Sequence, residues 1–273
     1  MQIDATARIE DGATIGPGAV IGPYCIIGRD VRIGAGCELV AHVHVEGRTS
    51  IGPRTVVHPF ARLGGPPQSV AYKGEPTTLS IGSDCVIRES VTMSRGTAQG
   101  GGETVVGDGG FFMAYSHVAH DCRVGSHAIF ANSATLAGHC TLGDHVFLSG
   151  LVAVHQFSRI GSGAMAAGVS AVRGDLIPYG LAAGAEARLI GINVVGMRRR
   201  QFPLADIRAA RLAYRLIFLG KGPLAERIDR AEGELGHVPA VAEIIAFLRA
   251  PRKRPLCQPR ARGRSTDEAA ITE

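Results

Sequence analysis

The chain has 273 residues, 45% hydrophobic and 5% aromatic, with 37 Gly and no Trp, a composition that excludes a disordered chain and predicts a thin core. It has no apolar run of about 18 residues and no signal peptide, so we expect a cytoplasmic protein without stable membrane insertion. The net charge is −2 over residues 1–197 and +7 over residues 198–273, which indicates an anionic partner, and no groove-reading motif points to nucleic acid.

Apolar residues recur at every sixth position through most of the chain. The register starts at Ile3, is interrupted after Leu63 and again after Met93, and ends at Val172, and glycine often follows the apolar residue. This pattern is typical of parallel β-helices built from hexapeptide repeats, in which each hexad supplies a short strand and a turn, and three hexads close a triangular coil of about 18 residues. We therefore predict a β-helix over residues 1–190, with stacked strands about 4.8 Å apart.

Five of the six cysteines fall at the fifth position of a hexad, where small residues pack the corner of the coil. These five are Cys25, Cys37, Cys85, Cys122 and Cys140. Their regular placement indicates a packing role. Because the chain contains no CxxC pair, the sequence supports neither a disulfide framework nor a thiolate zinc site.

Two stretches interrupt the repeat, at residues 64–77 and 94–104, and both are rich in Gly or Pro. This composition predicts loops that leave the prism. Long loops in a regular solenoid often carry binding, so we expect each of them to be a lid or a partner-facing segment.

Beyond residue 190 the repeat gives way to helical patterns. Residues 203–219 place apolar side chains at helical spacing, and shorter helices are expected near 224–235 and 239–248. We predict an α-helical C-terminal domain over residues 191–250, followed by an Arg- and Pro-rich disordered tail over residues 251–273.

A group of polar residues shares one outward edge of the predicted prism. His120 and His139 are 19 residues apart, His120 and Gln156 are 36 apart, His155 precedes Gln156, and His117 lies close to His120. Since one coil spans about 18 residues, side chains with these separations stack across successive coils. This row is the candidate functional site, because imidazoles serve as bases, acids and ligands near neutral pH.

Three classes of protein are compatible with such a row. A zinc lyase would need three imidazole nitrogens within about 2.1 Å of one ion. An acyltransferase would need one His as general base, a carboxylate to orient it and a backbone amide for the oxyanion. A structural subunit would need none of these. The adjacent pair His120 and Asp121 favours acyl transfer.

Seven motifs closely resemble those of the UDP-N-acetylglucosamine acyltransferases. They are HVAHDC at 117–122, ATLAGHC at 134–140, AVHQF at 153–157, IRESVT at 87–92, RGTAQGGG at 95–102, YKGEPT at 72–77 and GINVVGMRRR at 191–200. The resemblance covers roughly 250 residues. It implies a left-handed parallel β-helix of hexapeptide repeats followed by a small α-helical C-terminal domain. It also implies transfer of a 3-hydroxyacyl chain from acyl carrier protein to the glucosamine 3-position of UDP-N-acetylglucosamine, the first step of lipid A biosynthesis.

The same resemblance assigns roles to residues of this chain. His120 is the expected general base, Asp121 its orienting carboxylate, and the Gly138 amide the oxyanion donor. Residues expected to contact the sugar and acyl groups are Gln68, His117, His139, His155 and Gln156. Residues expected to contact the nucleotide are Asn193, Arg199 and Arg200. The family implies a homotrimer with sites between adjacent prisms, no metal and no bound cofactor, since the phosphopantetheine of acyl carrier protein carries the acyl donor.

Three positions depart from the family pattern. Where relatives commonly read QDLKY, this chain has Ser69 and Ala71, and Val195 replaces a usual acid. The alternative acceptor is therefore a variant sugar nucleotide, such as a 3-amino analogue. The other alternative is a zinc-dependent lyase of the γ-carbonic anhydrase type, although no two His have the His-x4-His spacing common in that class.

The position that measures acyl length in the family corresponds to Gly168 in this chain. A bulky side chain there closes the end of the acyl groove, whereas glycine leaves it open. Because each buried CH₂ contributes about 0.8 kcal/mol, the sequence predicts a preference for a chain near 14 carbons.

Overall fold

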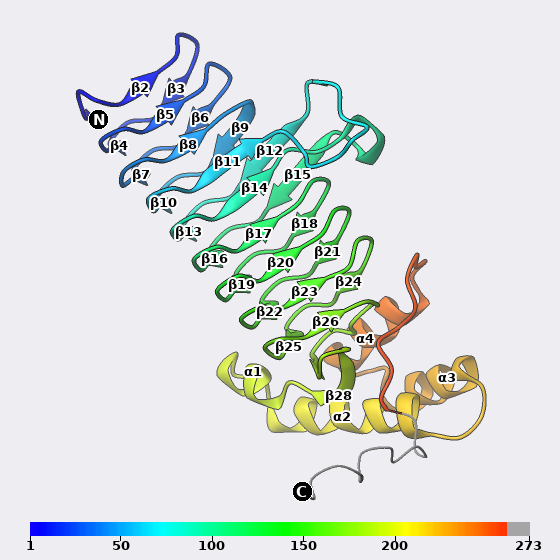
Figure 1. The fold of residues 1–273 in the computed structure, drawn as a ribbon. Helices are drawn as coiled ribbons and strands as arrows, with labels where there is room; N and C mark the ends of the chain where they lie inside the picture. The colour runs from blue at the N-terminus through cyan, green and yellow to red at the C-terminus, as the bar shows by residue number, and fades with distance from the viewer. Residues whose placement is uncertain (261–273) are drawn as a thin grey trace, which may run out of the picture.

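The structure is a computed structural model, and it describes residues 1–260. The chain folds into a long left-handed parallel β-helix, with the N-terminus at one end of the prism and a helical domain at the other (Figure 1). Three parallel sheets, here named A, B and C, form its faces.

The strands are short, and each sheet takes every third one along the prism; at the end of sheet A, β28 pairs antiparallel with β27. Sheet A contains β1 (Gln2–Ile3), β4 (Val20–Ile21), β7 (Glu38–Leu39), β10 (Val56–Val57), β13 (Val86–Ile87), β16 (Phe111–Phe112), β19 (Ile129–Phe130), β22 (Phe147–Leu148), β25 (Met165–Ala166), β27 (Gly180–Ala183) and β28 (Arg188–Ile192). Sheet B contains β2 (Arg8–Ile9), β5 (Ile26–Ile27), β8 (His44–Val45), β11 (Arg62–Gly65), β14 (Thr92–Ser94), β17 (His117–Val118), β20 (Thr135–Leu136), β23 (Ala153–Val154) and β26 (Ala171–Val172). Sheet C contains β3 (Thr14–Ile15), β6 (Arg32–Ile33), β9 (Arg48–Ile51), β12 (Thr78–Ile81), β15 (Glu103–Val106), β18 (Arg123–Val124), β21 (Thr141–Leu142) and β24 (Arg159–Ile160).

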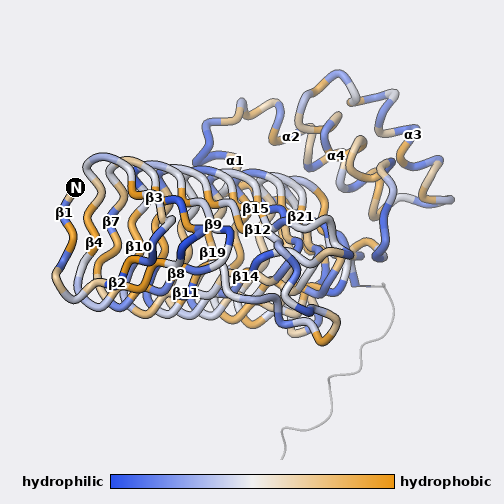
Figure 2. The backbone as a smooth tube through the Cα atoms, turned by 90° about the horizontal axis from the view of Figure 1, so that it is seen from above, coloured by the Kyte–Doolittle hydropathy of each residue, from blue (hydrophilic) through white to orange (hydrophobic). Residues whose placement is uncertain are grey.

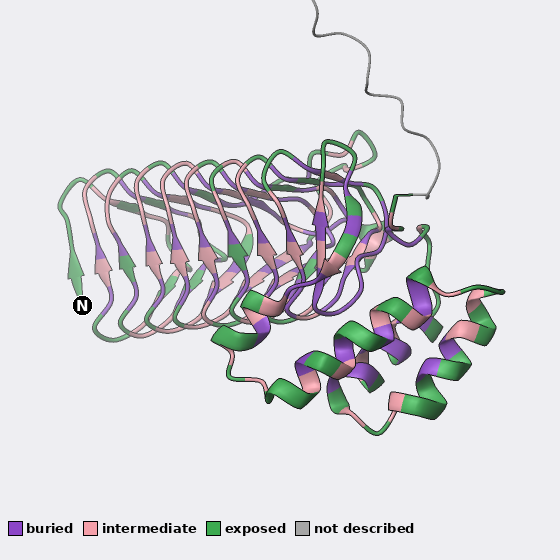
Figure 3. Ribbon diagram, turned by 90° about the horizontal axis from the view of Figure 1, so that it is seen from below, coloured by how far each residue is buried: buried purple, intermediate pink, exposed green. Residues whose placement is uncertain are grey.

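The register of the strand pairs confirms the predicted hexapeptide repeat. In sheet B, His117 pairs with Thr135 and Thr135 pairs with Ala153, each one coil of 18 residues further along. The second residue of most strands points inward, and these apolar side chains are buried along the prism (Figure 3). A triangular coil leaves room for a single layer of such side chains, which explains the thin core.

The hexad cysteines also have the packing role that the repeat predicted. All five are buried and form no disulfide. Burial raises the pKa of the Cys25, Cys37 and Cys85 thiols, so these groups stay protonated and behave as small apolar side chains.

The three sheets meet at three corners, and the same kind of turn recurs at each corner in successive coils. The A/B corner, between sheets A and B, includes Tyr24, His42, Phe60, Tyr115, Leu151 and Val169; the B/C corner includes Asp121, His139 and Phe157; the C/A corner includes His127, His145 and Gly163. All of these residues have positive φ, between +51° and +66°, as this turn requires. Asp and His tolerate this conformation better than most residues.

Both predicted loops leave the prism at the B/C corner, and they pack against each other. They are called here the first excursion, residues 66–77, and the second excursion, residues 95–102; the latter contains a short 3₁₀ turn, η1 (Ala98–Gly100). They project together from the middle of the prism (Figure 1). The Arg95 Nη2 atom donates to the Tyr72 hydroxyl at 3.0 Å, which joins the two excursions.

The helical domain covers the last coils. Its elements are α1 (Val194–Arg199), α2 (Leu204–Tyr214), a π-helical turn η2 (Arg215–Leu219), α3 (Leu224–Leu235) and α4 (Pro239–Arg249). Hydrophobic and hydrophilic segments alternate along these helices, as expected for amphipathic packing (Figure 2). The three predicted helices are present, but the first becomes a π turn after Tyr214, where Arg227 donates to the Ile217 carbonyl. None of the described helices is long and apolar enough to cross a membrane.

The structure differs from the predicted disordered tail over residues 251–260. Leu256 and Cys257 are buried, and Asp175 exchanges backbone hydrogen bonds of 2.8 Å with Pro255 and Cys257. This segment forms an isolated β-bridge with the chain at Asp175, and its apolar side chains are buried beside the last coil. Composition alone does not reveal this packing. Residues 261–273 lie outside the described part of the chain, and so does that part of the prediction.

Candidate active site

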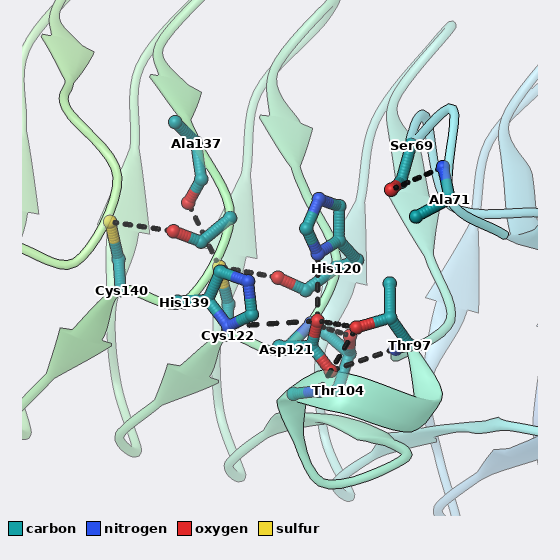
Figure 4. A network of polar contacts seen from close by, with 12 residues as sticks. Ser69, Ala71, Thr97, Thr104, His120, Asp121, Cys122, Ala137, His139 and Cys140 are labelled. Atoms are coloured by element: carbon teal, nitrogen blue, oxygen red, sulfur yellow. Dashed lines mark hydrogen bonds and ion pairs between the residues drawn. The ribbon is translucent and has the colours of Figure 1, made fainter.

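The site centres on His120 at the B/C corner, directly after strand β17. Its Nδ1 atom lies 2.7 Å from Oδ2 of Asp121 (Figure 4). A carboxylate accepts hydrogen bonds, so Nδ1 carries the proton and donates it to Asp121. In the neutral imidazole, Nε2 is then left with a free lone pair. The His120 side chain keeps 16% of its surface exposed, so the imidazole is partly open to an outside group.

Asp121 is held rigidly beneath His120. Its side chain is fully buried, and its backbone has the left-handed φ of +59°. The carboxylate also accepts from the Thr97 backbone N–H at 2.8 Å and the Thr97 hydroxyl at 2.7 Å. Its own backbone N–H donates to Thr104 Oγ1 at 2.8 Å. Charge-assisted hydrogen bonds of this length fix the rotamer of the carboxylate and hence the plane of the imidazole.

Gly138 lies against the imidazole, one coil further along. A Cβ atom at this position would stand 2.6 Å from His120 Cε1 and 2.9 Å from His120 Nε2, so any other residue would require the imidazole to move. Within residues 1–260 the Gly138 backbone N–H donates to no other group. The turn that packs against the His120 ring therefore has a free amide donor, which an oxyanion site requires.

A stack of rings continues the site along the B/C corner. His139 lies edge-on to His120, with ring centroids 5.1 Å apart, and stacks on Phe157 at 4.6 Å. Its Nδ1 atom is 3.7 Å from Asp121 Oδ2. Burial lowers the pKa of His139, against the opposing effect of Asp121, so the ring is mainly neutral near pH 7. His155 and Gln156 are both exposed at the next coil.

His117 stands on strand β17, at the face of sheet B next to the corner. The Thr92 hydroxyl lies 2.7 Å from its Nδ1 atom. Burial lowers the pKa of His117, which keeps this imidazole neutral near pH 7. A neutral ring held by a neighbouring hydroxyl can exchange hydrogen bonds with a polar substrate without bringing a charge.

A metal could in principle use part of this cluster. One ligand atom each of His120, Asp121 and His139 lies within 4.8 Å of the others. However, Asp121 Oδ2 already contacts the His120 Nδ1 and Thr97 Oγ1 atoms, each at 2.7 Å. A zinc ion would have to displace these hydrogen bonds to reach its usual distance of about 2.1 Å. The donor set therefore fits an oriented base better than a metal centre.

Comparisons with known proteins agree with this chemistry. The family model "Udp N-acetylglucosamine O-acyltransferase; Domain 2" matches residues 175–257, and "Bacterial transferase hexapeptide (six repeats)" matches residues 6–41. An acyl-[acyl-carrier-protein]–UDP-N-acetylglucosamine O-acyltransferase of Rhizobium etli is 51% identical over 94% of this chain and 95% of its own. The namesake of Azorhizobium caulinodans is 53% identical over 94% and 95%. The chain belongs to this O-acyltransferase family.

Solved structures of this family have the same fold as this chain. The UDP-N-acetylglucosamine O-acyltransferase of Moraxella catarrhalis superposes with a TM-score of 0.91 at 38% identity. The match covers 94% of this chain and 100% of that one. The acyltransferase of Acinetobacter baumannii gives a TM-score of 0.88 at 39% identity, over 92% and 98%. The helical domain is thus part of the acyltransferase architecture, as is the prism.

Within this acyltransferase, the first excursion brings Gln68 to the B/C corner. Gln68 is exposed, and Ser69 and Ala71 lie on the first excursion, which leaves the prism at the same B/C corner that carries His120 (Figure 4). The Ala71 backbone N–H donates to Ser69 Oγ at 3.4 Å, so the serine side chain turns back onto its own loop. The two departures from the family motif therefore lie at the B/C corner, as His120 does.

The other predicted residues lie at different corners of the acyltransferase. Asn193 caps α1 by accepting from the Gly196 N–H at 2.9 Å, and it donates to the Gly163 carbonyl at 3.0 Å, which places it at the C/A corner. Arg200 reaches the same glycine, and Arg199 is exposed. Gly168 is exposed at the A/B corner, beside Val169. A single chain therefore does not bring these residues to His120.

Sequence reasoning missed the residues that hold Asp121. Thr97 and Thr104 supply its hydrogen bonds, and Gly100 packs so closely that a Cβ atom would stand 2.0 Å from the carboxyl carbon. These residues come from the segment predicted to be a lid or a partner-facing loop. The Gly-rich motif RGTAQGGG was the available signal, because repeated glycines mark a close backbone approach.

Proposed function

We propose that this acyltransferase moves a 3-hydroxyacyl chain from acyl carrier protein to the glucosamine 3-hydroxyl of UDP-N-acetylglucosamine, the first step of lipid A biosynthesis. The observation that carries the proposal is the hydrogen-bonded pair of His120 and Asp121 with a free Gly138 amide beside it. We place the reaction in the cytoplasm, in line with the expectation from the sequence.

The pair accounts for each proton in the reaction. His120 Nε2 takes the proton of the sugar hydroxyl as its oxygen attacks the thioester carbonyl. The Gly138 N–H donates to the oxyanion that forms, and Asp121 stabilises the imidazolium. When the tetrahedral intermediate collapses, the carbon–sulfur bond breaks, and His120 returns the proton to the departing phosphopantetheine thiolate. The product is the ester, and the base is regenerated.

The remaining polar residues of the B/C corner are proposed to position the two substrates. His117 and His139 flank the base as neutral rings, so they can form hydrogen bonds to sugar or carbonyl groups. Gln68, His155 and Gln156 are exposed within the same region and are proposed to complete the contacts.

We further propose a homotrimer, and the positions of three residues support it. His120 is at the B/C corner, Gly168 at the A/B corner and Arg200 at the C/A corner. Three corners of one prism cannot face a single ligand. If the base, the acyl-length residue and the nucleotide-binding arginine act on one substrate complex, adjacent chains have to contribute them. Asn193 and Arg199 would then belong, with Arg200, to the nucleotide site that one chain offers its neighbour.

Incubation with defined substrates tests the function. The purified protein is supplied with 3-hydroxyacyl carrier proteins of several lengths and with either UDP-N-acetylglucosamine or its 3-amino analogue, and the products are measured by mass spectrometry. O-acylated UDP-N-acetylglucosamine is the expected product.

The 3-amino analogue is the second candidate acceptor, because Ser69, Ala71 and Val195 remove polar contacts from the family pattern. Exclusive N-acylation of the analogue would replace the proposed acceptor while keeping acyl transfer. No product with either acceptor would contradict the reaction itself.

A further inference from the structure

The C-terminal segment over residues 251–258, called here the strap, returns to the B/C corner. Its backbone is fixed beside the last coil. Pro255 accepts from the Asp175 N–H, and Cys257 donates to the Asp175 carbonyl, both at 2.8 Å. Leu256 and Cys257 are buried there, and Leu189 donates to the Gln258 carbonyl at 3.2 Å. These bonds hold the preceding residues of the strap against the row of site residues.

Two cations of the strap extend the ring stack of the site. The Lys253 Nζ atom lies 4.9 Å from the centroid of the Phe157 ring, and the Arg254 guanidinium carbon lies 6.0 Å from it. Arg254 Nε also donates to the Gln156 carbonyl at 2.9 Å. Since Phe157 stacks on His139, the sequence of contacts runs from the base to the strap along one corner.

Within residues 1–260, no carboxylate neutralises the charges of these two residues. No carboxylate oxygen lies within 4.0 Å of Lys253 or Arg254 among the residues the structure describes. By contrast, the buried Asp175 is paired with Arg159 at 2.7 Å, and Arg249 contacts two acids. Lys253 and Arg254 are thus adjacent, partly or fully exposed cations at the end of the candidate site.

We propose that Lys253 and Arg254 form a phosphate-binding element of the active site. This inference rests on the proposed function, in which both substrates are phosphate esters. The phosphate could belong to the diphosphate of the nucleotide sugar or to the phosphodiester of the carrier's phosphopantetheine arm. In either case the planar guanidinium and the compact ammonium offer several N–H donors to one anionic group. Both cations also lie over the ring of Phe157, in cation–π contact.

The test compares variants of the full chain in which one or both of these positive charges are removed. Lys253→Gln and Lys253→Gln/Arg254→Gln remove the proposed contacts, and the single variant leaves the Arg254 bond to Gln156 in place. Arg252→Gln/Arg260→Gln is the matched control, because it removes the same charge from two exposed positions, one in the strap and one two residues beyond it. Thermal unfolding of each variant confirms that the fold is kept.

Kinetics and direct binding provide the two readouts. We expect the double variant to raise KM for one substrate by about tenfold, as for the loss of a hydrogen bond to a charged group, with kcat within about twofold of the unchanged chain. A rise confined to the nucleotide sugar, with weaker calorimetric binding of UDP, assigns the diphosphate. A rise confined to the carrier protein, with weaker binding of free phosphopantetheine, assigns the phosphodiester.

Two results would overturn the proposal. One is an unchanged KM for both substrates in the double variant. The other is an equal rise in the matched control, which would indicate a general effect of net charge. If the unchanged chain transferred no acyl group at all, the proposed function would fail, while the binding of UDP and of phosphopantetheine would still decide whether the strap holds phosphate.

Discussion

The hydroxyl of Thr97 lies 2.7 Å from Oδ2 of Asp121, although 24 residues separate the two in sequence. The Thr97 backbone N–H donates to the other carboxylate oxygen at 2.8 Å. The second excursion is therefore part of the support of the base, since it closes over the carboxylate that orients His120.

Replacing Thr97 by Val removes the hydroxyl donor while keeping the shape of the side chain. We expect kcat to fall about tenfold or more, with little change in KM, because a hydrogen bond to a charged group is worth about 1.5–3 kcal/mol. Steady-state kinetics measures kcat and KM.

Thr97→Ser keeps the hydroxyl and is the control for this prediction. It should retain most of the activity. Wild-type kcat in Thr97→Val, or equal losses in the two variants, would remove the hydroxyl from the support of Asp121.

Gly100→Ala should impair the same carboxylate by steric overlap. Its Cβ would stand 2.0 Å from the carboxyl carbon of Asp121 and 2.2 Å from Oδ2, so one of the two groups has to move. We expect a lower kcat, measured in the acyl-transfer assay. Gly233→Ala in α3 is the matched control, because its Cβ meets nothing within 4 Å. Unchanged activity in Gly100→Ala would show that the excursion does not hold the carboxylate.

His120→Ala should lower turnover by about 10²-fold or more, the range expected for the loss of a general base. The fold should persist, because the side chain is at the surface of the prism rather than in its core. His127→Ala, at the C/A corner, is the control and should keep its activity. Near-normal turnover of His120→Ala across pH 6 to 8 would disprove the catalytic assignment.

Gly168→Met should shift the preferred acyl length. Gly168 is exposed beside Val169, and its Cβ would lie 3.3 Å from the Gly150 carbonyl oxygen, so a side chain fits after a small adjustment. We expect the unchanged chain to prefer about 14 carbons over ten, because four additional buried CH₂ groups, at about 0.8 kcal/mol each, contribute roughly 3.2 kcal/mol. Competition between carrier proteins of both lengths measures the ratio. The Met variant should reverse it, and an unaltered ratio would take Gly168 out of the acyl site.

The stability of the fold should fall as the pH is lowered from about 7 to about 5. Burial lowers the pKa of His117, so the unfolded state binds more protons in this window. The contribution of His117 is fully present above its unfolded pKa of about 6.5 and is lost as the pH falls. Chemical unfolding at fixed protein concentration measures the slope. His117→Gln should reduce it, and the same slope in both proteins would contradict the prediction.

The sequence by itself determined the prism and most of the site row. A residue in a regular β-helix contacts its equivalents one coil of about 18 residues away, so contacts between coils follow from arithmetic. The separations of His120, His139 and Gln156 therefore sufficed to bring these residues to one corner. The apolar hexad positions fixed which side chains point inward, because one face of each strand has to be buried.

Only the tertiary structure decided which segments pack against the site residues of the B/C corner. The bond between Thr97 and Asp121 and the return of the strap to Asp175 join segments that have no period, so no spacing rule relates them. Asn193 became a helix cap for the same reason, since its partners Gly196 and Gly163 are set by how the last coil meets α1. Such contacts depend on the packing of irregular chain against the finished prism, and this packing exists only once the coils have stacked.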